Sequence, residues 1–390
     1  GTPADKRRLL QAHAGHLASF VASPLFSLCV FMSKSVRDGE RLRWRSDNEK
    51  SVLSTNFERR GWTRCDDNDW NVYWASPHTI KQIFSPDNGI RLSDSQMVNH
   101  FPNHLELTRK DLMVKNLKRY RKELERVAAE RAISDANQRN STSDANQRNS
   151  SHGNTDQRND LDLDFECIPT TFILPADYAL LAEEFRRSPN SMWIMKPTSK
   201  SQGIGIFIVN RLSQIKRWVA QRVNATAPKD AYVCSRYIAD PLLIGGKKFD
   251  LRLYVLVVGY RPLKVYVYRR GFARFSSVNY SYEANELDND LIHLTNVAIQ
   301  KHSGTYSHTH GWKWSLEDLI KYIEGTRGAA AASQLMESMG WVIVHSLKAC
   351  QNSMIHDRHC FECYGYDMMI DDNLKPWLIE VNASPSLSTT

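Results

Sequence analysis

Near its end the chain reads Cys363-Tyr-Gly-Tyr-Asp-Met-Met-Ile-Asp-Asp-Asn-Leu-Lys-Pro-Trp-Leu-Ile-Glu-Val-Asn-Ala-Ser-Pro-Ser-Leu387, two apolar runs joined by an Asp-Asp-Asn turn. Asp367 lies on the first run, and Glu380 and Asn382 lie two apart on the second. Residues two apart in a strand point to the same face, so a β-hairpin would aim all three side chains at one point. Such oxygen donors suit Mg²⁺, which proteins usually bind through one or two carboxylates together with substrate phosphates. The alternative is a hairpin whose charges are simply solvated.

Residues 192–209 have the pattern of a phosphate-binding loop between two short apolar strands. Lys196 lies at the end of the first strand, and Gly203 and Gly205 follow in the loop. Glycines let backbone amides approach a phosphate because no Cβ blocks them, although a lone Gly-x-Gly is also common in ordinary hairpins. Kinases place their glycine loop before the lysine, and no P-loop sequence occurs here. We therefore predict a nucleotide site of another class.

Several blocks, taken in order and spacing together with Lys196, resemble the tubulin-tyrosine-ligase-like family. These blocks are Ser201–Ile206, Gly246–Arg252, His293–Asn296 and Leu378–Leu387. Asn99–Asn116 and Arg358–Tyr366 look most like the polyglutamylase catalytic subunits of that family, and the likeness covers roughly residues 43–390 with one insertion. The resemblance implies an ATP-grasp fold of the α/β (α+β) class. It also implies ATP and Mg²⁺, with two ions, as cofactors, and addition of L-glutamate to glutamate side chains of tubulin C-terminal tails.

The resemblance also implies a role for each matching residue. The residues expected to hold ATP are Lys196, Gln202, Gly203, Ser235, Arg236, Tyr237, Ile238, Lys248, Phe249, Asp250, Thr295 and Asn296. Those expected to bind magnesium are Asp367, Glu380 and Asn382.

Further residues concern the substrates and the chemistry. Arg274 and Lys313 are implied to hold the incoming glutamate, since carboxylates need fixed cations and a guanidinium can bind one bidentately. Gln202 is implied to face the acceptor peptide as well as ATP. Arg252, together with Lys196, is implied to stabilise the transferring phosphoryl group or the intermediate.

Some of these residues have simpler interpretations. Arg274 could be an ordinary surface residue, Lys313 could pack over the tryptophans beside it, and Lys248 and Asp250 could form an ion pair at a strand edge. The sequence also departs from the family pattern. Many relatives carry a basic residue at the position of Ile204 and a glutamine at that of Ser235, so the phosphate contact is in doubt at Ile204.

Composition favours an acidic partner. The 390 residues carry 51 Lys and Arg against 43 Asp and Glu, a formal net charge of +8, which suits an acidic peptide such as a tubulin tail. Nucleic acid is less favoured because no zinc-finger or RRM signature appears. The basic run Arg109–Arg131 has apolar residues at helical spacing, which predicts a helix packed by one face that could also offer cations to an acidic tail.

The seven cysteines are scattered, and an odd number in a long chain indicates reduced thiols and a cytosolic setting. A zinc site formed by His356, His359, Cys360 and Cys363 is a weak alternative, because a single Cys-x-x-Cys has no second pair and Cys360–Tyr366 is more typical of a strand.

The expected organisation has four parts. Residues 1–42 form a leader, which we expect to be disordered and a poor membrane anchor because its apolar part is short. Residues 43–132 form a small mixed domain whose aromatic residues belong to a core. Residues 133–160 are a polar, repetitive insert expected to be disordered. Residues 161–390 form the catalytic region, with a C-terminus that we expect to be truncated.

Within the catalytic region the apolar patterns predict alternating helices and strands. The predicted helices are Ala176–Arg187, Leu212–Arg222, Ser315–Ile323 and Ala329–Ser353, and the predicted strands are Ala231–Ile238, Leu251–Val258 and Leu263–Tyr268.

The preferred function is therefore a tubulin polyglutamylase, an ATP-dependent amino-acid ligase of the cytoplasm and cytoskeleton, including the cilium, its axoneme or the basal body, and without a role at membranes. The alternatives are a tubulin glycylase, or a catalytically weak tubulin-binding scaffold. The branch that the chain resembles also implies partner subunits of a polyglutamylase complex.

Overall fold

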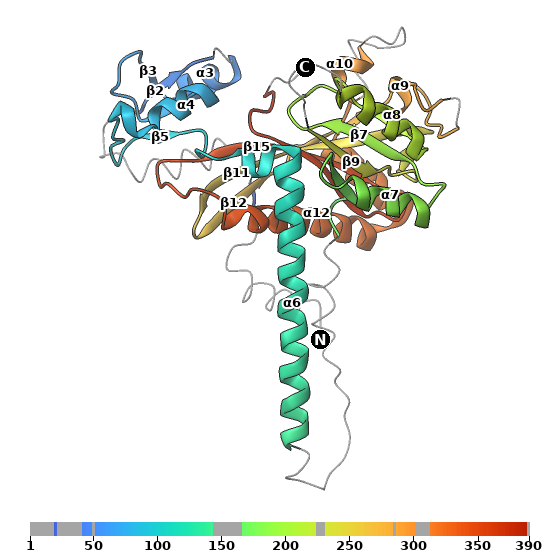
Figure 1. Cartoon of the computed structure of the whole chain (residues 1–390). Coiled ribbons are helices and arrows are strands. Elements are labelled where there is room, and N and C mark those ends of the chain that lie inside the picture. The colour runs from blue at the N-terminus through green and yellow to red at the C-terminus, as the bar shows by residue number, and fades with distance from the viewer. Residues whose placement is uncertain are drawn as a thin grey trace.

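The structure is a computed structural model that describes residues 19–21, 41–48, 51–142, 166–223, 231–283, 286–301 and 313–387. Three sheets with packed helices make up this part of the chain (Figure 1). The predicted mixed α/β class is confirmed.

The largest sheet is built around the long strand β11, which pairs antiparallel with β10, β12, β13 and β15. β15 and β16 form the predicted hairpin, β14 extends the sheet beyond β13, and β1 pairs parallel with β12. The strands are β1 (Ser19–Val21), β10 (Leu243–Ile244), β11 (Lys247–Tyr260), β12 (Leu263–Tyr268), β13 (Phe272–Phe275), β14 (Lys313–Ser315), β15 (Glu362–Ile370) and β16 (Pro376–Asn382). β1 lies within the leader that was expected to be disordered, and the rest of residues 1–40 lies outside the described residues. The edge of a sheet offers unpaired backbone groups that a short segment can pair with.

Strand β11 is apolar along most of its length because both of its faces are covered. Leu251, Leu253 and Val255 point into the main core, which includes α11 (Leu316–Arg327) and α12 (Ala329–Gln351). Tyr254 and Leu256 point to the other face, where the N-terminal region covers them.

The N-terminal region holds a small parallel sheet with short helices packed beside it. As predicted, its aromatic residues are core residues, and Trp62, Trp70, Tyr73 and Trp74 are all buried. Its elements are β2 (Arg43–Ser46), α3 (Ser51–Glu58), β3 (Thr63–Arg64), β4 (Val72–Trp74), α4 (Pro77–Ile83), the 3₁₀ helix η1 (Pro86–Asn88), β5 (Met97–Val98) and α5 (Leu105–Thr108).

The basic helix α6 (Lys110–Thr142) packs its first turns against α5, α12 and β9 through the buried residues Met113, Val114 and Leu117. Its later turns project away from the body (Figure 1). The helix continues beyond residue 133, where the disordered insert was expected to begin, since extending a formed helix costs little. The rest of that insert lies outside the described residues.

The third sheet, in the order β6-β9-β7-β8, carries the predicted glycine loop between β7 and β8. Helices α7 and α8 pack beside it, close to their predicted bounds. The remaining elements are β6 (Thr171–Leu174), α7 (Tyr178–Arg187), β7 (Trp193–Pro197), β8 (Phe207–Val209), α8 (Leu212–Val223), β9 (Tyr232–Arg236), α9 (Asp290–His293) and α10 (Val297–Gln300).

None of the helices in the described ranges combines the length and apolar character needed to cross a membrane.

Candidate functional site

One face of the large sheet changes from apolar to charged along β11. Tyr254 and Leu256 are covered by the N-terminal region, whereas Lys248, Asp250 and Arg252 continue the same alternation toward the start of the strand. The N-terminal region does not cover this end of the face, so a row of ionisable groups faces the third sheet.

The register of five strands arranges these groups side by side. Asp250 lies opposite Arg274 of β13, and Arg252 lies opposite Asp367 of β15. The row continues outward at both ends, because Arg274 lies opposite Lys313 of β14 and Asp367 lies opposite Glu380 of β16. We call these six residues the charged row: Lys313, Arg274, Asp250, Arg252, Asp367 and Glu380.

Two guanidinium groups hold the buried Asp367 carboxylate. Arg252 binds both of its oxygens, with Nη2 2.9 Å from Oδ2, and Arg274 Nη2 lies 3.1 Å from Oδ2. Burial alone would raise the pKa of Asp367, but Arg274 and Arg252 outweigh it and hold the pKa below the ordinary value. The interpretation of this hairpin as carrying merely solvated charges is therefore wrong.

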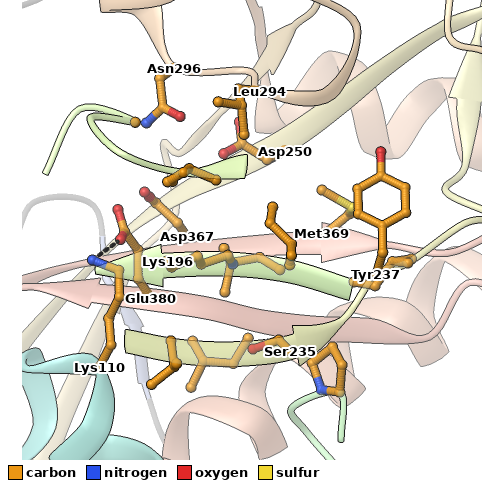
Figure 2. Close-up of a pocket in the computed structure, with 18 of the residues that line it drawn as sticks. Lys110, Lys196, Ser235, Tyr237, Asp250, Leu294, Asn296, Asp367, Met369 and Glu380 are labelled. Carbon is orange, nitrogen blue, oxygen red and sulfur yellow. Dashed lines mark ion pairs between the residues drawn. The ribbon is translucent and has the colours of Figure 1, made fainter. Parts of the chain in front are cut away.

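Glu380 forms the acidic end of the charged row, and Asn382 lies beside it. Asn382 Nδ2 lies 3.4 Å from Asp367 Oδ2 and 3.5 Å from Glu380 Oε1, so the predicted convergence of the three side chains is confirmed. Lys110 Nζ, at the start of α6, lies 3.0 Å from Glu380 Oε2 (Figure 2). It also donates to the carbonyl of Lys200, 3.1 Å away.

A pocket lies between the charged row and the third sheet, and Lys196 lines it together with Asp367 and Glu380 (Figure 2). Burial lowers the pKa of Lys196 to about 8, against the opposing effect of Glu380. A bound anion would raise this pKa again, because an opposite charge nearby favours the ammonium form.

The glycine loop closes one side of this pocket. Gln202, Gly203 and Gly205 all have positive φ angles, of 60°, 82° and 75°, which is costly for a non-glycine residue such as Gln202. The φ of Gly203 favours glycine, and a Cβ there would lie 2.5 Å from Ile299 Cδ1, so a larger residue would have to displace the Ile299 side chain of α10.

The far end of the pocket holds a buried polar cluster. Lys248 Nζ lies 2.9 Å from the Tyr237 hydroxyl and 3.0 Å from the carbonyl oxygen of His293. Ser235 accepts a hydrogen bond from Thr171 at 2.9 Å, and Thr295 is buried beside Asn296 on the pocket wall. Burial lowers the pKa of Lys248 to about 7, with Lys196 adding to the effect.

Most residues implied to bind ATP or metal line this one pocket, although they come from five separate segments of the chain. The lining includes Lys196, Gln202, Gly203, Ser235, Arg236, Tyr237, Ile238, Lys248, Asp250, Thr295, Asn296, Asp367 and Glu380. The residues outside the lining are Phe249, Arg252, Arg274, Lys313 and Asn382. The Phe249 side chain lies in the core because it alternates with Lys248 and Asp250 on β11, and its ring is tilted against that of Phe275 with ring centroids 5.1 Å apart.

The structure also tests the simpler interpretations of Arg274, of Lys248 with Asp250, and of Lys313. A surface position for Arg274 is wrong, because its side chain is buried between Asp250 and Asp367. A Lys248–Asp250 ion pair is also wrong, since Arg274 is the partner of Asp250. Lys313 Nζ lies 5.3 Å from the centroid of the Phe272 ring, a cation–π contact. Of the two tryptophans beside Lys313, Trp312 lies outside the described residues.

The cysteine-rich segment supports the strand interpretation. Cys363 lies on β15 and Cys360 just before it, and both are buried free thiols.

The further lining residues to which the sequence analysis assigned no role include Lys110, His293 and Met369. Met369 could have been found, because it lies two residues after Asp367 on the same face of a strand. Lys110 was hidden in a basic helix, and only tertiary packing brings it to Glu380.

Asp367, Glu380 and Asn382 carry the donor types that suit the metal implied by the family resemblance, because two carboxylates and an amide oxygen are hard ligands for Mg²⁺. Asp367 and Glu380 are directly opposite across a strand pair, and the Asn382 amide nitrogen lies within 3.5 Å of both carboxylates.

Comparison of the sequence with known proteins identifies the family of this chain. Residues 90–390 match the model of the tubulin-tyrosine ligase family. The chain is 51% identical over 358 residues to a probable alpha-tubulin polyglutamylase, Ttll1, of Tetrahymena thermophila, covering 90% of this chain and 81% of the relative. It is 38% identical over 380 residues to a probable tubulin polyglutamylase, TTLL9, of Rattus norvegicus, covering 90% and 75%. The human tubulin polyglutamylase TTLL5 is 34% identical over 333 residues, which are 82% of this chain but 22% of that protein. This chain belongs to the tubulin-tyrosine ligase family.

Proposed function

We propose that this protein is an ATP- and Mg²⁺-dependent ligase that attaches L-glutamate to glutamate side chains of tubulin C-terminal tails. The observation that carries the proposal is the shared pocket, in which Asp367 and Glu380 face Lys196 and the glycine loop. The names of the relatives, which are tubulin polyglutamylases, supply the substrate class.

The proposed reaction has two steps. A γ-carboxylate oxygen of a tubulin glutamate attacks the γ-phosphorus of ATP, the bond to ADP breaks, and an acyl phosphate forms. The α-amine of free glutamate then attacks the acyl carbon, phosphate leaves, and the nitrogen loses a proton to give an isopeptide bond. Positioning supplies much of the rate, because the amine must meet the acyl phosphate before water does.

The residues of the pocket have distinct proposed tasks. Asp367, Glu380 and Asn382 would hold Mg²⁺, which when bound neutralises charge on the phosphates. Lys196 and Lys248 are amines with lowered pKa values beside the same cavity, and an anionic ligand would draw both into the ammonium form. Phosphate charge can then be stabilised without reorganising the site.

The neighbouring cations Arg274 and Lys313 support glutamate rather than glycine as the added amino acid. They lie opposite each other across β13 and β14, and glutamate has a second carboxylate that a second cation can engage. Arg274 is already bound to Asp250 and Asp367, so we assign the larger share of this contact to Lys313.

The acceptor and the setting follow from charge and relatives. A net charge of +8 favours an acidic peptide as the acceptor, and we infer that the protein works on the cytoskeleton, including axonemes or basal bodies of cilia. The same inference extends to partner subunits of a polyglutamylase complex, which could supply microtubule targeting.

Glu380→Gln tests the proposal with little change in shape. We expect ligation to fall by at least ~100-fold, since the variant loses one carboxylate of the metal and phosphate region. The measurement is mass spectrometry of tubulin tails after incubation with ATP, Mg²⁺ and isotope-labelled glutamate or glycine. Glu337→Gln is the matched control, because Glu337 is an exposed carboxylate on α12.

The outcomes separate the candidate functions. Glutamate addition that survives Glu380→Gln would refute the assigned site, and addition of glycine instead would make the protein a glycylase. A scaffold would show no Mg²⁺-dependent ATP binding in a calorimeter. This outcome is tested because Ile204, in the glycine loop, is apolar where many relatives carry a basic residue.

A further inference from the structure

A chain of hydrogen bonds runs from the pocket into the protein behind Lys248. The Lys248 amine lies 2.9 Å from the Tyr237 hydroxyl, and that hydroxyl lies 2.8 Å from Nδ1 of His293. Nε2 of His293 lies 2.9 Å from the carbonyl oxygen of Glu286. Lys248, Tyr237 and His293 are all buried, so water does not compete for these bonds.

The direction of each hydrogen bond follows from the ends of the chain. The Glu286 carbonyl can only accept, so Nε2 of His293 carries the proton. Burial lowers the pKa of His293, which keeps the ring neutral and leaves Nδ1 as an acceptor. The Tyr237 hydroxyl therefore donates to Nδ1, and its oxygen accepts from Lys248.

Both ring nitrogens of His293 are thus engaged within the protein, although the residue lines the pocket. The Lys248 ammonium has three N–H donors. One points to Tyr237 and one to the His293 carbonyl oxygen 3.0 Å away, which leaves a single donor for a ligand in the pocket.

We propose that His293 is a positioning residue, whose neutral ring orients the Tyr237 hydroxyl and thereby aims the remaining Lys248 donor at the nucleotide. This inference rests on the proposed ATP-dependent function. It assigns His293 a role that acts through Tyr237 and Lys248 rather than through contact of a ring nitrogen with the substrate.

Variants on both sides of the Tyr237–His293 bond test the relay. Tyr237→Phe keeps the ring, whose centroid lies 4.6 Å from Lys248 Nζ, and removes only the hydroxyl. His293→Phe removes the acceptor, whereas His293→Gln offers both an acceptor and a donor. Calorimetry with Mg-ATP should show ~10-fold weaker binding for Tyr237→Phe and for His293→Phe, the loss expected for one hydrogen bond to a charged group.

The double variant Tyr237→Phe/His293→Phe should bind no more weakly than either single variant, because both changes break one relay. His293→Gln should recover part of the affinity. In steady-state ligation the KM for ATP should rise ~10-fold while kcat changes less than ~3-fold. Losses that add in the double variant, or Tyr237→Phe binding like the wild type, would overturn the inference.

A measurement on the wild-type protein guards against variants that fail to fold. Nitrogen NMR of the ¹⁵N-histidine-labelled protein should show that the His293 ring is neutral and protonated at Nε2. The His293 signal is identified by its loss in His293→Gln or by its contact with Tyr237. A ring protonated at Nδ1, or at both nitrogens, at neutral pH would overturn the inference. Wild-type protein that does not bind Mg-ATP would instead refute the proposed function, so the two failures are distinguishable.

Discussion

The charged row and the projecting part of α6 contain the same kind of arginine–carboxylate pair in opposite surroundings. In the row, Arg252 binds Asp367 and Arg274 binds Asp250, and these side chains are at most about one-eighth exposed. On α6, Arg126 bonds to Glu123 one turn before it and Glu130 one turn after it, and all three side chains are more than half exposed.

The difference shows that burial, rather than pairing alone, decides how much the loss of one partner of an ion pair changes stability. Exposed pairs contribute little to stability, because water and salt screen the attraction and two long side chains must be held in one geometry. Buried pairs cannot lose a partner without leaving a charge in a medium that solvates it poorly. The α6 pairs also engage arginines that we expected to be available to an acidic tail, so the tail-binding role of α6 stays a prediction. The predicted packing of one face of α6 is confirmed by its buried residues.

Removing one partner of a buried ion pair should have the largest effect on stability. Arg252→Met keeps much of the side-chain volume but removes the group that binds both oxygens of Asp367. We expect the free energy of unfolding to fall by ~3–5 kcal/mol, the usual cost of leaving a buried charge uncompensated. Urea denaturation measures this change, and a loss below ~1 kcal/mol would show that Arg274 alone satisfies Asp367.

The partly buried amine of Lys196, beside the charged row, should give an intermediate, pH-dependent effect. The pKa of Lys196 is about 8 in the folded protein, against about 10.5 for an ordinary lysine. Between these values the unfolded chain binds more protons, so stability rises with pH across this window and the penalty is fully present below it.

Lys196→Met removes this contribution. Because Lys196 keeps some contact with solvent, we expect the wild type to gain only ~1–2 kcal/mol relative to the variant between about pH 8 and pH 10. Urea denaturation at several pH values tests this, and parallel pH profiles for the two proteins would contradict it. Affinity for Mg-ATP should change in the opposite direction, falling as the amine loses its proton.

The exposed side of the comparison should barely respond. Arg126→Gln breaks the bonds to Glu123 and Glu130 but keeps a good helix former, so the urea midpoint should stay within experimental error. Adding salt should reduce even that difference, because exposed charges are screened. A clear loss of stability would mean that the projecting helix contacts another part of the protein.

Much of the fold could be predicted from local pattern. The hairpin of β15 and β16, the strands around the glycine loop and the helices α7, α8, α11 and α12 all follow from apolar periodicity. Residue spacing also predicted that Asp367, Glu380 and Asn382 share a face, which the strand register confirms. The short strand β1 and the continuation of α6 could not be predicted, because each depends on a neighbouring element to extend.

The sequence by itself determined which side chains of a strand share a face, because side chains alternate between the two faces along a strand. Only the tertiary structure decided how those residues act on one another. The register of β11 with β13 and β15 pairs Asp250 with Arg274 and Arg252 with Asp367, and packing of α6 brings Lys110 to Glu380. Such pairings join residues far apart in the chain, and no local pattern specifies them.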